Sequence, residues 1–284
     1  MMEDIIYLVL QGGGIRCAWQ AGFVAALEGE RPIRPHAISA VSASSAVACA
    51  IVCRRLEFAV NCFRAAIDGN KKNIYLSRVL RGERAFPHAE IYRKVLLQVF
   101  DKAALQELYA GPDIQVLVTR PSTKLPRYPS LVIGLTLCAC KAFRTRRRCV
   151  RFETQFGFSR EFIAVKECAT PAELADLILA SSCTPPVTPW YSLHGRPVLD
   201  GGLCESVPLS GLPRKQGKTL VLLTSKSTTI SRSPGIVYAE PSEDLRIASW
   251  DYTDARKIDY LYALGKKDGS TFLKNADMPR TSSG

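Results

Sequence analysis

The feature that most constrains this chain is a short apolar strand that runs into a serine and then into small residues. Residues 38–41 have the composition of a buried strand, and residues 43–55 continue as an apolar helix. Ser42 stands at the corner between them. A tight strand–serine–helix turn places the hydroxyl at a helix N-terminus, where backbone N–H groups and the helix dipole favour developing negative charge. We therefore predict that Ser42 is a nucleophile.

A glycine-rich loop precedes this turn. Residues 5–10 form a continuous apolar run, the loop Gly12-Gly13-Gly14 follows, and residues 18–27 then show helical spacing. Glycines let backbone N–H groups turn toward a substrate oxygen, so the loop is predicted to supply donors for an oxyanion. A dinucleotide-binding turn is disfavoured because the third glycine of that motif is missing. A purely structural turn is the other interpretation.

Strands and helices alternate along the rest of the chain. Helical periodicity is found at residues 56–66, 89–108, 171–182 and 254–273, and strand-like runs at 114–119, 130–138, 162–165 and 219–224. This alternation predicts an α/β fold with a mostly parallel central sheet and helices on both faces. We expect one domain over residues 1–275 and a flexible C-terminal tail over residues 276–284.

The partner of the serine is less obvious, because a serine hydroxyl needs a base within hydrogen-bond reach. The chain has three histidines: His36 on the strand before Ser42, His88 at a helix start, and His194 in a loop. Asp200 is the better candidate, because it ends an extended segment and two glycines follow it. A Ser–His–Asp triad through His194 is the alternative, and a plain turn is the structural interpretation of Asp-Gly-Gly.

Three ordered motifs resemble the signature blocks of the patatin-like phospholipase family: Gln11–Arg16, Ala40–Ser44 and Asp200–Gly202. Residues 180–186 and 250–266 are also similar to segments of that family, so the resemblance covers nearly the whole chain. It implies a patatin-like catalytic domain with a three-layer architecture related to that of α/β-hydrolases.

The resemblance also implies roles for individual residues. Ser42 would be the nucleophile and Asp200 the base of a Ser–Asp dyad. Gly12, Gly13 and Gly14 would form the oxyanion loop, and Arg16 would order that loop or meet a phosphate. The implied reaction is that of a serine esterase of phospholipase A type, which hydrolyses fatty-acyl esters of phospholipids or related lipids through an acyl-enzyme. It needs no cofactor or metal.

The chain departs from the family pattern at three positions near these motifs. Ala40 and Ser44 replace the two glycines that flank the serine turn, and Cys17 stands where the family usually has glycine. Side chains at these positions could crowd the turn or the loop. The alternative hypothesis is therefore a regulatory or binding protein on the same fold, with weak or no activity.

Charge and composition bound the partners and the location. The net charge of +12 favours an anionic partner or simply a soluble basic protein. Cations gather at residues 71–84 and 141–151, and the second group (Arg144, Arg146, Arg147, Arg148) predicts peripheral contact with an anionic membrane. Nucleic acid is not expected, because aromatic residues are not interleaved with these cations. The sequence identifies no protein activator.

Neither a signal peptide nor a membrane-spanning segment is recognisable, which predicts a cytoplasmic or peripheral-membrane protein. Export by a specialised secretion system would leave no readable mark. Several of the ten cysteines lie within apolar runs and are predicted to be buried thiols. Their spacing and the scarcity of histidine disfavour a zinc site.

Overall fold

The computed structural model describes residues 5–121, 157–213, 217–226 and 233–277. The strands are β1 (Ile5–Leu10), β2 (Ala37–Val41), β3 (Asp113–Arg120), β4 (Ser159–Ala164), β5 (Tyr191–Leu193), β6 (Arg196–Asp200), β7 (Lys218–Leu222) and β8 (Ile236–Ala239). The α-helices are α1 (Cys17–Glu30), α2 (Ser44–Val52), α3 (Leu56–Asp68), α4 (Leu76–Val79), α5 (His88–Val99), α6 (Lys102–Ala110), α9 (Pro171–Ser181) and α10 (Arg256–Asp277). Short 3-10 helices are η1 (Gly14–Arg16), η2 (Val165–Glu167), η3 (Gly201–Leu203) and η4 (Leu209–Gly211).

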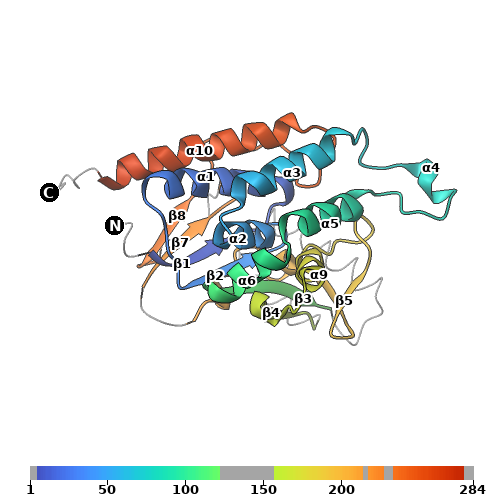
Figure 1. The fold of residues 1–284 in the computed structure, drawn as a ribbon, viewed down its shortest axis with the longest axis horizontal. Helices are drawn as coiled ribbons and strands as arrows, with labels where there is room; N and C mark the ends of the chain where they lie inside the picture. Colours follow the sequence, from blue (N-terminus) through green and yellow to red (C-terminus); the bar gives the residue numbers. More distant parts are fainter. Residues whose placement is uncertain (1–4, 122–156, 214–216, 227–232, 278–284) are drawn as a thin grey trace.

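A mixed, mostly parallel sheet with helices on both sides forms the centre of the molecule (Figure 1). The strand order is β5-β6-β3-β2-β1-β7-β8, and β4 also pairs with β3. β1, β2, β3, β7 and β8 are parallel to one another, whereas β4 and β6 run antiparallel to β3. The predicted α/β class, with a mostly parallel sheet covered by helices, is confirmed.

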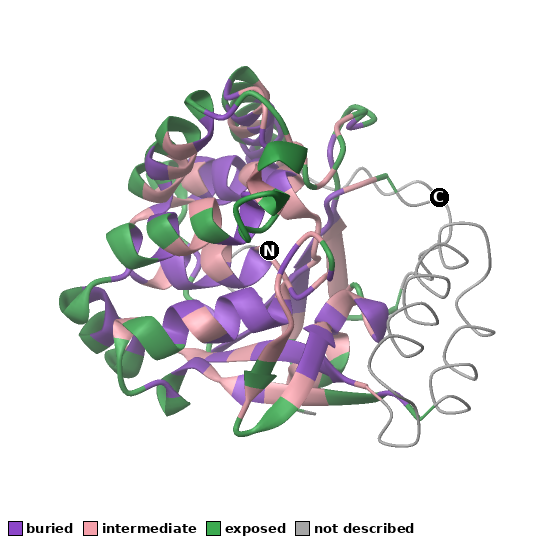
Figure 2. Ribbon diagram, turned by 90° about the vertical axis from the view of Figure 1, so that its right-hand side faces the viewer, coloured by how far each residue is buried: buried purple, intermediate pink, exposed green. Residues whose placement is uncertain are grey.

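The two faces of the sheet belong to two different apolar clusters. Leu8 and Leu10 of β1 join the main core beneath the large helices, whereas Val9 joins a smaller cluster with Val221 and the segment that carries η4. Successive side chains of a strand point to opposite faces, so the continuous apolar run of β1 fills both clusters. Figure 2 shows the buried residues concentrated in the strands and in the helix faces that cover them.

The C-terminal helix α10 lies along α1 at the outside of the helical layer (Figure 1). A Cβ atom on Gly22 would lie 2.1 Å from the carbonyl oxygen of Tyr262, and one on Gly265 would lie 2.1 Å from that of Trp19. Glycine at both positions therefore lets the two backbones touch. Trp19 Nε1 donates a buried hydrogen bond of 2.7 Å to Asp268 Oδ2. Because α1 follows the glycine loop through η1, this packing fixes where the loop ends.

Three local features differ from the predictions. Residues 43–55 and 56–66, predicted to run on as helix, form the two helices α2 and α3, because the chain turns at Arg54, which has φ +52°. Residues 89–108 also form two helices, and Asp101 caps α6 by accepting a hydrogen bond from the Ala104 N–H group. The apolar period continues across both breaks, so periodicity alone does not locate them. The proline-rich residues 184–196, where the strand-like runs predict no strand, contain β5.

Some predicted features lie outside the described residues. They include the strand at 130–138 and the basic segment 141–151 with Arg144, Arg146, Arg147 and Arg148. α10 ends at Asp277, and the rest of the expected tail is not described. Within the described residues, no helix combines the length and the apolar character needed to cross a bilayer.

Candidate active site

The strand β3 brings the predicted nucleophile and base together. β2 pairs with β3 up to Val41, which lies opposite Leu117, and β6 pairs with the next residues of β3, so that Asp200 lies opposite Val118. Two consecutive residues of β3 therefore pair with Val41, the residue before Ser42, and with Asp200. Ser42 Oγ donates a hydrogen bond of 2.7 Å to Asp200 Oδ2, although the two residues are 158 positions apart.

Ser42 has a backbone conformation that residues with side chains rarely adopt. Its φ is +60°, in the left-handed region, where a non-glycine residue persists only if its surroundings hold it. One such contact comes from α9: the Ser42 N–H group donates to Ser181 Oγ at 2.7 Å. The buried Ser181 hydroxyl in turn donates to the Leu117 carbonyl oxygen at 2.7 Å. Helix α9 and strand β3 thus lock the turn, which we call the elbow (residues 40–44).

The Asp200 carboxylate is half-buried and has a second hydrogen-bond partner. Its Oδ1 accepts the Gly202 N–H group at 2.7 Å, which leaves Oδ2 for Ser42. Removal of water raises the pKa of Asp200 to about 6, although both hydrogen bonds oppose this shift. The carboxyl group is therefore ionised at neutral pH, while its proton affinity exceeds that of an ordinary aspartate.

The glycine loop (residues 12–14) lies against the elbow. A Cβ atom on Gly12 would lie 3.1 Å from the Val41 carbonyl oxygen and 3.3 Å from Ser42 Cβ. The Gly12 N–H group donates to the Ser206 carbonyl oxygen at 3.2 Å. The Gly13 N–H group donates a hydrogen bond to the Cys17 sulfur, whereas the Gly14 N–H group has no hydrogen-bond partner within the described part of the chain.

The Arg16 side chain is hydrogen-bonded to the segment that contains Ile247. Its Nε donates to the Ile247 carbonyl oxygen at 2.7 Å. Beside it, the Ile15 N–H group donates to the Ser249 carbonyl oxygen at 2.9 Å. These two bonds tie the end of the glycine loop to the segment 247–250.

None of the three histidines is bonded to Ser42 or Asp200 among the described residues. His36 and His194 are exposed, and His194 lies in the turn between β5 and β6. His88 is buried, and its Nε2 lies 2.7 Å from the Trp250 carbonyl oxygen. Burial lowers the pKa of His88.

The three residues that depart from the family pattern fit their sites. Ser44 is fully buried, and its Oγ lies 2.8 Å from the Val41 carbonyl oxygen and 3.0 Å from that of Leu10, while it accepts the Val41 N–H group at 3.1 Å. Ala40 is fully buried in the main core. Cys17 is also buried, and burial raises the pKa of its thiol to about 12.

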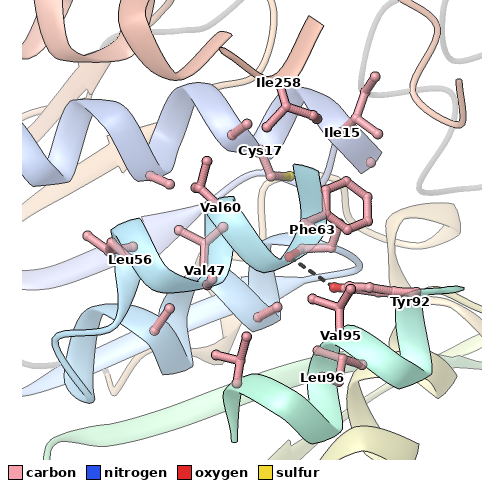
Figure 3. A pocket seen from close by; sticks show the side chains of 18 of the residues that line it. Ile15, Cys17, Val47, Leu56, Val60, Phe63, Tyr92, Val95, Leu96 and Ile258 are labelled. Atoms are coloured by element: carbon pink, nitrogen blue, oxygen red, sulfur yellow. Dashed lines mark hydrogen bonds between the residues drawn. The ribbon is translucent and has the colours of Figure 1, made fainter. Parts of the chain in front are cut away.

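An apolar cavity begins beside the elbow and follows α2 between α1, α3 and α5 (Figure 3). Ala43, Ala46, Val47 and Ala50 line it, and this spacing places them along one face of α2, leading away from Ser42. The cavity also touches Gly14. The space between its walls, including the part open to solvent, is about 640 Å³.

A few polar atoms reach this cavity. The Tyr92 hydroxyl lies 3.5 Å from the Ala43 carbonyl oxygen, beside the elbow, and the Cys17 thiol also lines the wall (Figure 3). Burial raises the pKa of Tyr92, so its hydroxyl stays protonated. The rest of the lining is almost entirely apolar. No group of three or more metal-ligating side chains is found in the described ranges.

Sequence reasoning did not find two parts of this site. Ser181 received no role, because nothing in its own neighbourhood indicates that its hydroxyl reaches a residue 139 positions away. The sequence also does not locate the cavity along α2, because small residues on a helix are equally typical of close helix packing. The spacing of the alanines after Ser42 was the available signal for it.

A family model described as patatin-like phospholipase matches residues 8–212, so the chain belongs to the patatin-like phospholipase family. The predicted resemblance is confirmed, and the family is one of lipid hydrolases. No curated protein sequence matches it significantly.

Two solved structures are similar to this chain. VipD from Legionella pneumophila is 9% identical with a TM-score of 0.49, and the match covers 96% of this chain and 67% of VipD. The type III effector protein ExoU is 11% identical with a TM-score of 0.38, and the match covers 97% of this chain and 54% of ExoU.

Proposed function

We propose that the protein is a lipid acyl hydrolase in which Ser42 is the nucleophile and Asp200 the base of a two-residue dyad. The observation that carries this proposal is the 2.7 Å hydrogen bond between Ser42 Oγ and Asp200 Oδ2 at an elbow with positive φ. Membership of the patatin-like phospholipase family supports it. A base with a pKa of about 6 suits proton transfer near neutral pH.

The reaction follows from the positions of these groups. Ser42 Oγ attacks the carbonyl carbon of the ester while its proton passes to Asp200 Oδ2. The negative charge that develops on the carbonyl oxygen is stabilised by N–H groups of the glycine loop, above all that of Gly14, which has no partner among the described residues. The intermediate then collapses, the bond to the alcohol oxygen breaks, and that oxygen takes the proton from Asp200. Water, deprotonated by Asp200, attacks the acyl-Ser42 ester and releases the fatty acid, and the proton returns to Ser42.

The remaining predicted residues take supporting roles in this scheme. Gly12 donates its N–H group to Ser206, so we assign it to the close approach of loop and elbow. Arg16 orders the loop through the Ile247 carbonyl oxygen. Ser181 uses up the Ser42 N–H group, which leaves the oxyanion to the glycine loop.

The substrate class follows from the cavity along α2. An alkyl chain gains free energy when it leaves water for an apolar wall, and the cavity starts at the elbow, where the reacting carbonyl would lie. We therefore propose a fatty-acyl ester of a phospholipid or related lipid, with the acyl chain between α1, α2, α3 and α5. The reaction is that of a serine esterase of phospholipase A type.

Labelling with a fluorophosphonate probe tests the dyad, because it requires an activated serine. We expect the wild-type protein to react and Ser42→Ala not to react. Asp200→Asn should slow labelling and ester hydrolysis by at least about a thousandfold. Ser192→Ala, which removes an exposed hydroxyl on β5, is the control and should match wild type. Hydrolysis retained in Ser42→Ala would show that the nucleophile is another residue, and equal loss in His194→Ala would restore the triad.

The rival hypothesis is a regulatory or binding protein with an inactive elbow. It draws on the replacement of both elbow glycines, by Ala40 and Ser44. Both side chains are fully buried, and Ser44 adds hydrogen bonds rather than an obstruction, which favours the hydrolase. A wild-type protein that folds cooperatively but neither labels nor hydrolyses any acyl ester would support the rival.

A further inference from the structure

Residues 71–85, which we call the finger, project from the body of the protein around α4 (Figure 1). Contacts within the finger close its neck. The Tyr75 N–H group donates to the Ala85 carbonyl oxygen at 2.8 Å, and the Tyr75 hydroxyl accepts the N–H groups of Lys71 and Lys72, each at 3.1 Å. The finger therefore has a shape of its own, although it does not pack on the sheet.

Apolar side chains stand out from this projection. Leu80 is 90% exposed and Leu76 is 74% exposed, the two highest values for large apolar residues in the described ranges. Val79 and Ile74, in the same turn of chain, are also exposed. Figure 2 views the molecule from the side on which the finger projects. Contiguous exposed apolar groups in a soluble protein indicate an interaction surface.

The charge of the finger indicates which kind of partner this surface binds. Residues 71–85 contain five cations (Lys71, Lys72, Arg78, Arg81, Arg84) and one acid, Glu83. Arg78 pairs with Glu83 and with Glu90 of α5, and Arg81 pairs with Glu83. Lys71 and Lys72 are exposed and form no ion pair with any described residue. Apolar groups flanked by cations are the combination that binds the headgroup boundary of an anionic membrane.

The first leg of the finger is anchored beside the glycine loop. Asn73 bonds to both the Asp251 carboxylate, at 3.1 Å, and the Tyr252 N–H group, at 2.9 Å. Asn70 Nδ2 donates to the Tyr252 carbonyl oxygen at 2.7 Å. Tyr252 lines the apolar cavity, and the chain just before it holds the glycine loop through Ser249.

The second leg is anchored beside the dyad. Arg84 donates to the Pro186 carbonyl oxygen at 2.8 Å. Pro186 belongs to the loop that leaves α9 after Ser182, whose Oγ is 3.5 Å from Ser42 Oγ. Trp250, 47% exposed, lies next to the first leg and adds an aromatic ring of the kind that favours membrane interfaces. Both legs therefore end at the rim of the proposed active site.

We propose that the finger docks the protein onto an anionic phospholipid bilayer. Leu76, Val79 and Leu80 enter the headgroup boundary, Lys71 and Lys72 meet lipid phosphates, and the rim of the active site is brought to the lipid esters. Docking would bring the protein to the lipid substrate of the proposed function, and in that respect this proposal rests on the proposed function. Binding to the bilayer itself requires no hydrolysis, so the two can be tested separately.

The test uses the full chain with Ser42→Ala, so that the vesicles stay intact. Its binding is measured by cosedimentation with vesicles of phosphatidylcholine and phosphatidylserine, and with phosphatidylcholine alone. We expect salt-sensitive binding to the anionic vesicles only, and a fall in affinity of about tenfold or more on adding Leu76→Ser and Leu80→Ser. Lys71→Glu with Lys72→Glu should weaken binding to the anionic vesicles.

Matched controls lie elsewhere on the surface. Phe58 on α3 and Leu97 on α5 are 47% and 42% exposed, so Phe58→Ser with Leu97→Ser removes exposed apolar groups away from the finger. This control should bind like the parent. Equal binding of the finger variant and the parent, or an equal loss in the control, would overturn the proposal. So would concentration-dependent dimers that disappear in the finger variant without any vesicle binding, because the partner would then be a second copy of the chain.

A second measurement separates docking from chemistry. With Ser42 present, the finger variant should hydrolyse a water-soluble short-chain ester at the wild-type rate but phospholipid in anionic vesicles at least about tenfold more slowly. Equal slowing on both substrates would indicate damage to the site and contradict docking. If wild type proves inactive on both, the proposed function fails, whereas the cosedimentation result still decides whether the finger binds membranes.

Discussion

The glycine loop and the elbow are two tight turns in contact with each other, yet they tolerate side chains very differently. A Cβ atom on Gly13 would lie 2.5 Å from Thr224 Oγ1, and one on Gly14 would lie 1.8 Å from the Ser249 carbonyl oxygen. In the elbow, by contrast, Ala40 and Ser44 occupy the family's two glycine positions and are completely buried. The glycine loop has no room for a Cβ atom at Gly13 or Gly14, whereas the elbow accommodates the side chains of Ala40 and Ser44.

The difference shows that glycines in a family pattern serve distinct purposes. In the loop, glycine is required by the closeness of other atoms, and at Gly14 also by a φ of +57°. In the elbow, the strained conformation is at Ser42 itself, and its neighbours need only be small enough to pack. A substitution at an elbow glycine therefore does not by itself predict an inactive protein.

The largest effect is expected for Gly14→Ala. Its methyl group would collide with the backbone of Ser249, and the backbone would have to leave its left-handed conformation. We expect esterase activity to fall by at least about a hundredfold through displacement of an oxyanion donor, and the free energy of unfolding to fall by about 2 kcal/mol or more. Activity assays and urea unfolding measure both. Gly29→Ala, where a Cβ would meet nothing within 4 Å, is the control; a similar loss there would remove the steric argument.

The second largest effect concerns the pKa of Asp200, whose carboxylate accepts the hydrogen bond from Ser42 in the elbow. The pKa of Asp200 is raised from 3.8 to about 6 in the folded protein. Between these values the folded state holds the proton more tightly than the unfolded chain, so stability falls as pH rises. Above pH 6 the ionised group costs on the order of 1–3 kcal/mol. We therefore expect Asp200→Asn to be inactive, yet more stable than wild type in urea at pH 8 and about equal to it at pH 4.

A control for this comparison is Asp244→Asn, whose side chain is 72% exposed and should show no such pH-dependent gain. The ester hydrolysis rate of the wild type should rise with pH around a midpoint near 6, because the base must be ionised. A rate that stays flat from pH 5 to 8, or stabilisation of Asp200→Asn at pH 4 as large as at pH 8, would contradict the assignment.

A smaller effect is expected when Ser44 is returned to the family's glycine. Its hydroxyl connects the Val41 N–H group with the Leu10 carbonyl oxygen at the end of β1. Ser44→Gly and Ser44→Ala should both lower the free energy of unfolding by about 1–2 kcal/mol, and activity should drop rather than rise. Thermal unfolding and the labelling rate report on this. An increase in labelling rate for Ser44→Gly would mean that the hydroxyl obstructs the elbow after all.

The smallest effect is expected for Ala40→Gly. The Ala40 methyl group lies in the main core, so its loss should lower the free energy of unfolding by about 1 kcal/mol. Activity should stay within about twofold of wild type, because the methyl group packs in the main core and forms no hydrogen bond to Ser42 or Asp200. Steady-state kinetics on a soluble ester are sufficient to detect a departure, and a tenfold change in either direction would show that both elbow positions tune the nucleophile.

Much of this architecture was predictable from the sequence. The run Ile5–Leu10 and the strand before Ser42 are buried on both faces, so their apolar character identifies them without further knowledge. The sequence also predicts Ser42, Asp200 and the three glycines as site residues, partly from local pattern and partly from family resemblance. The structure brings Ser42 and Asp200 within hydrogen-bond distance of each other.

The remainder depends on contacts between distant segments. The helix breaks at Arg54 and Asp101 interrupt neither apolar pattern, because apolar residues recur at helical spacing on both sides of each break. The space left by Ala46 and Ala50 becomes a cavity only because α1, α3 and α5 stand around it. Likewise, nothing around Ser181 indicates that β3 and the elbow will meet its hydroxyl. Such features become visible only when the sheet is assembled.

The pairing of β3 with both β2 and β6 has a consequence for when the proposed chemistry can begin. During synthesis, Ser42 and β3 leave the ribosome long before residue 200, and until β6 joins β3 the hydroxyl faces no carboxylate. A truncated or half-assembled chain would carry its nucleophile in a dormant form. Hydrolytic capacity would then arise in a single late event, and its appearance would report that the sheet is complete.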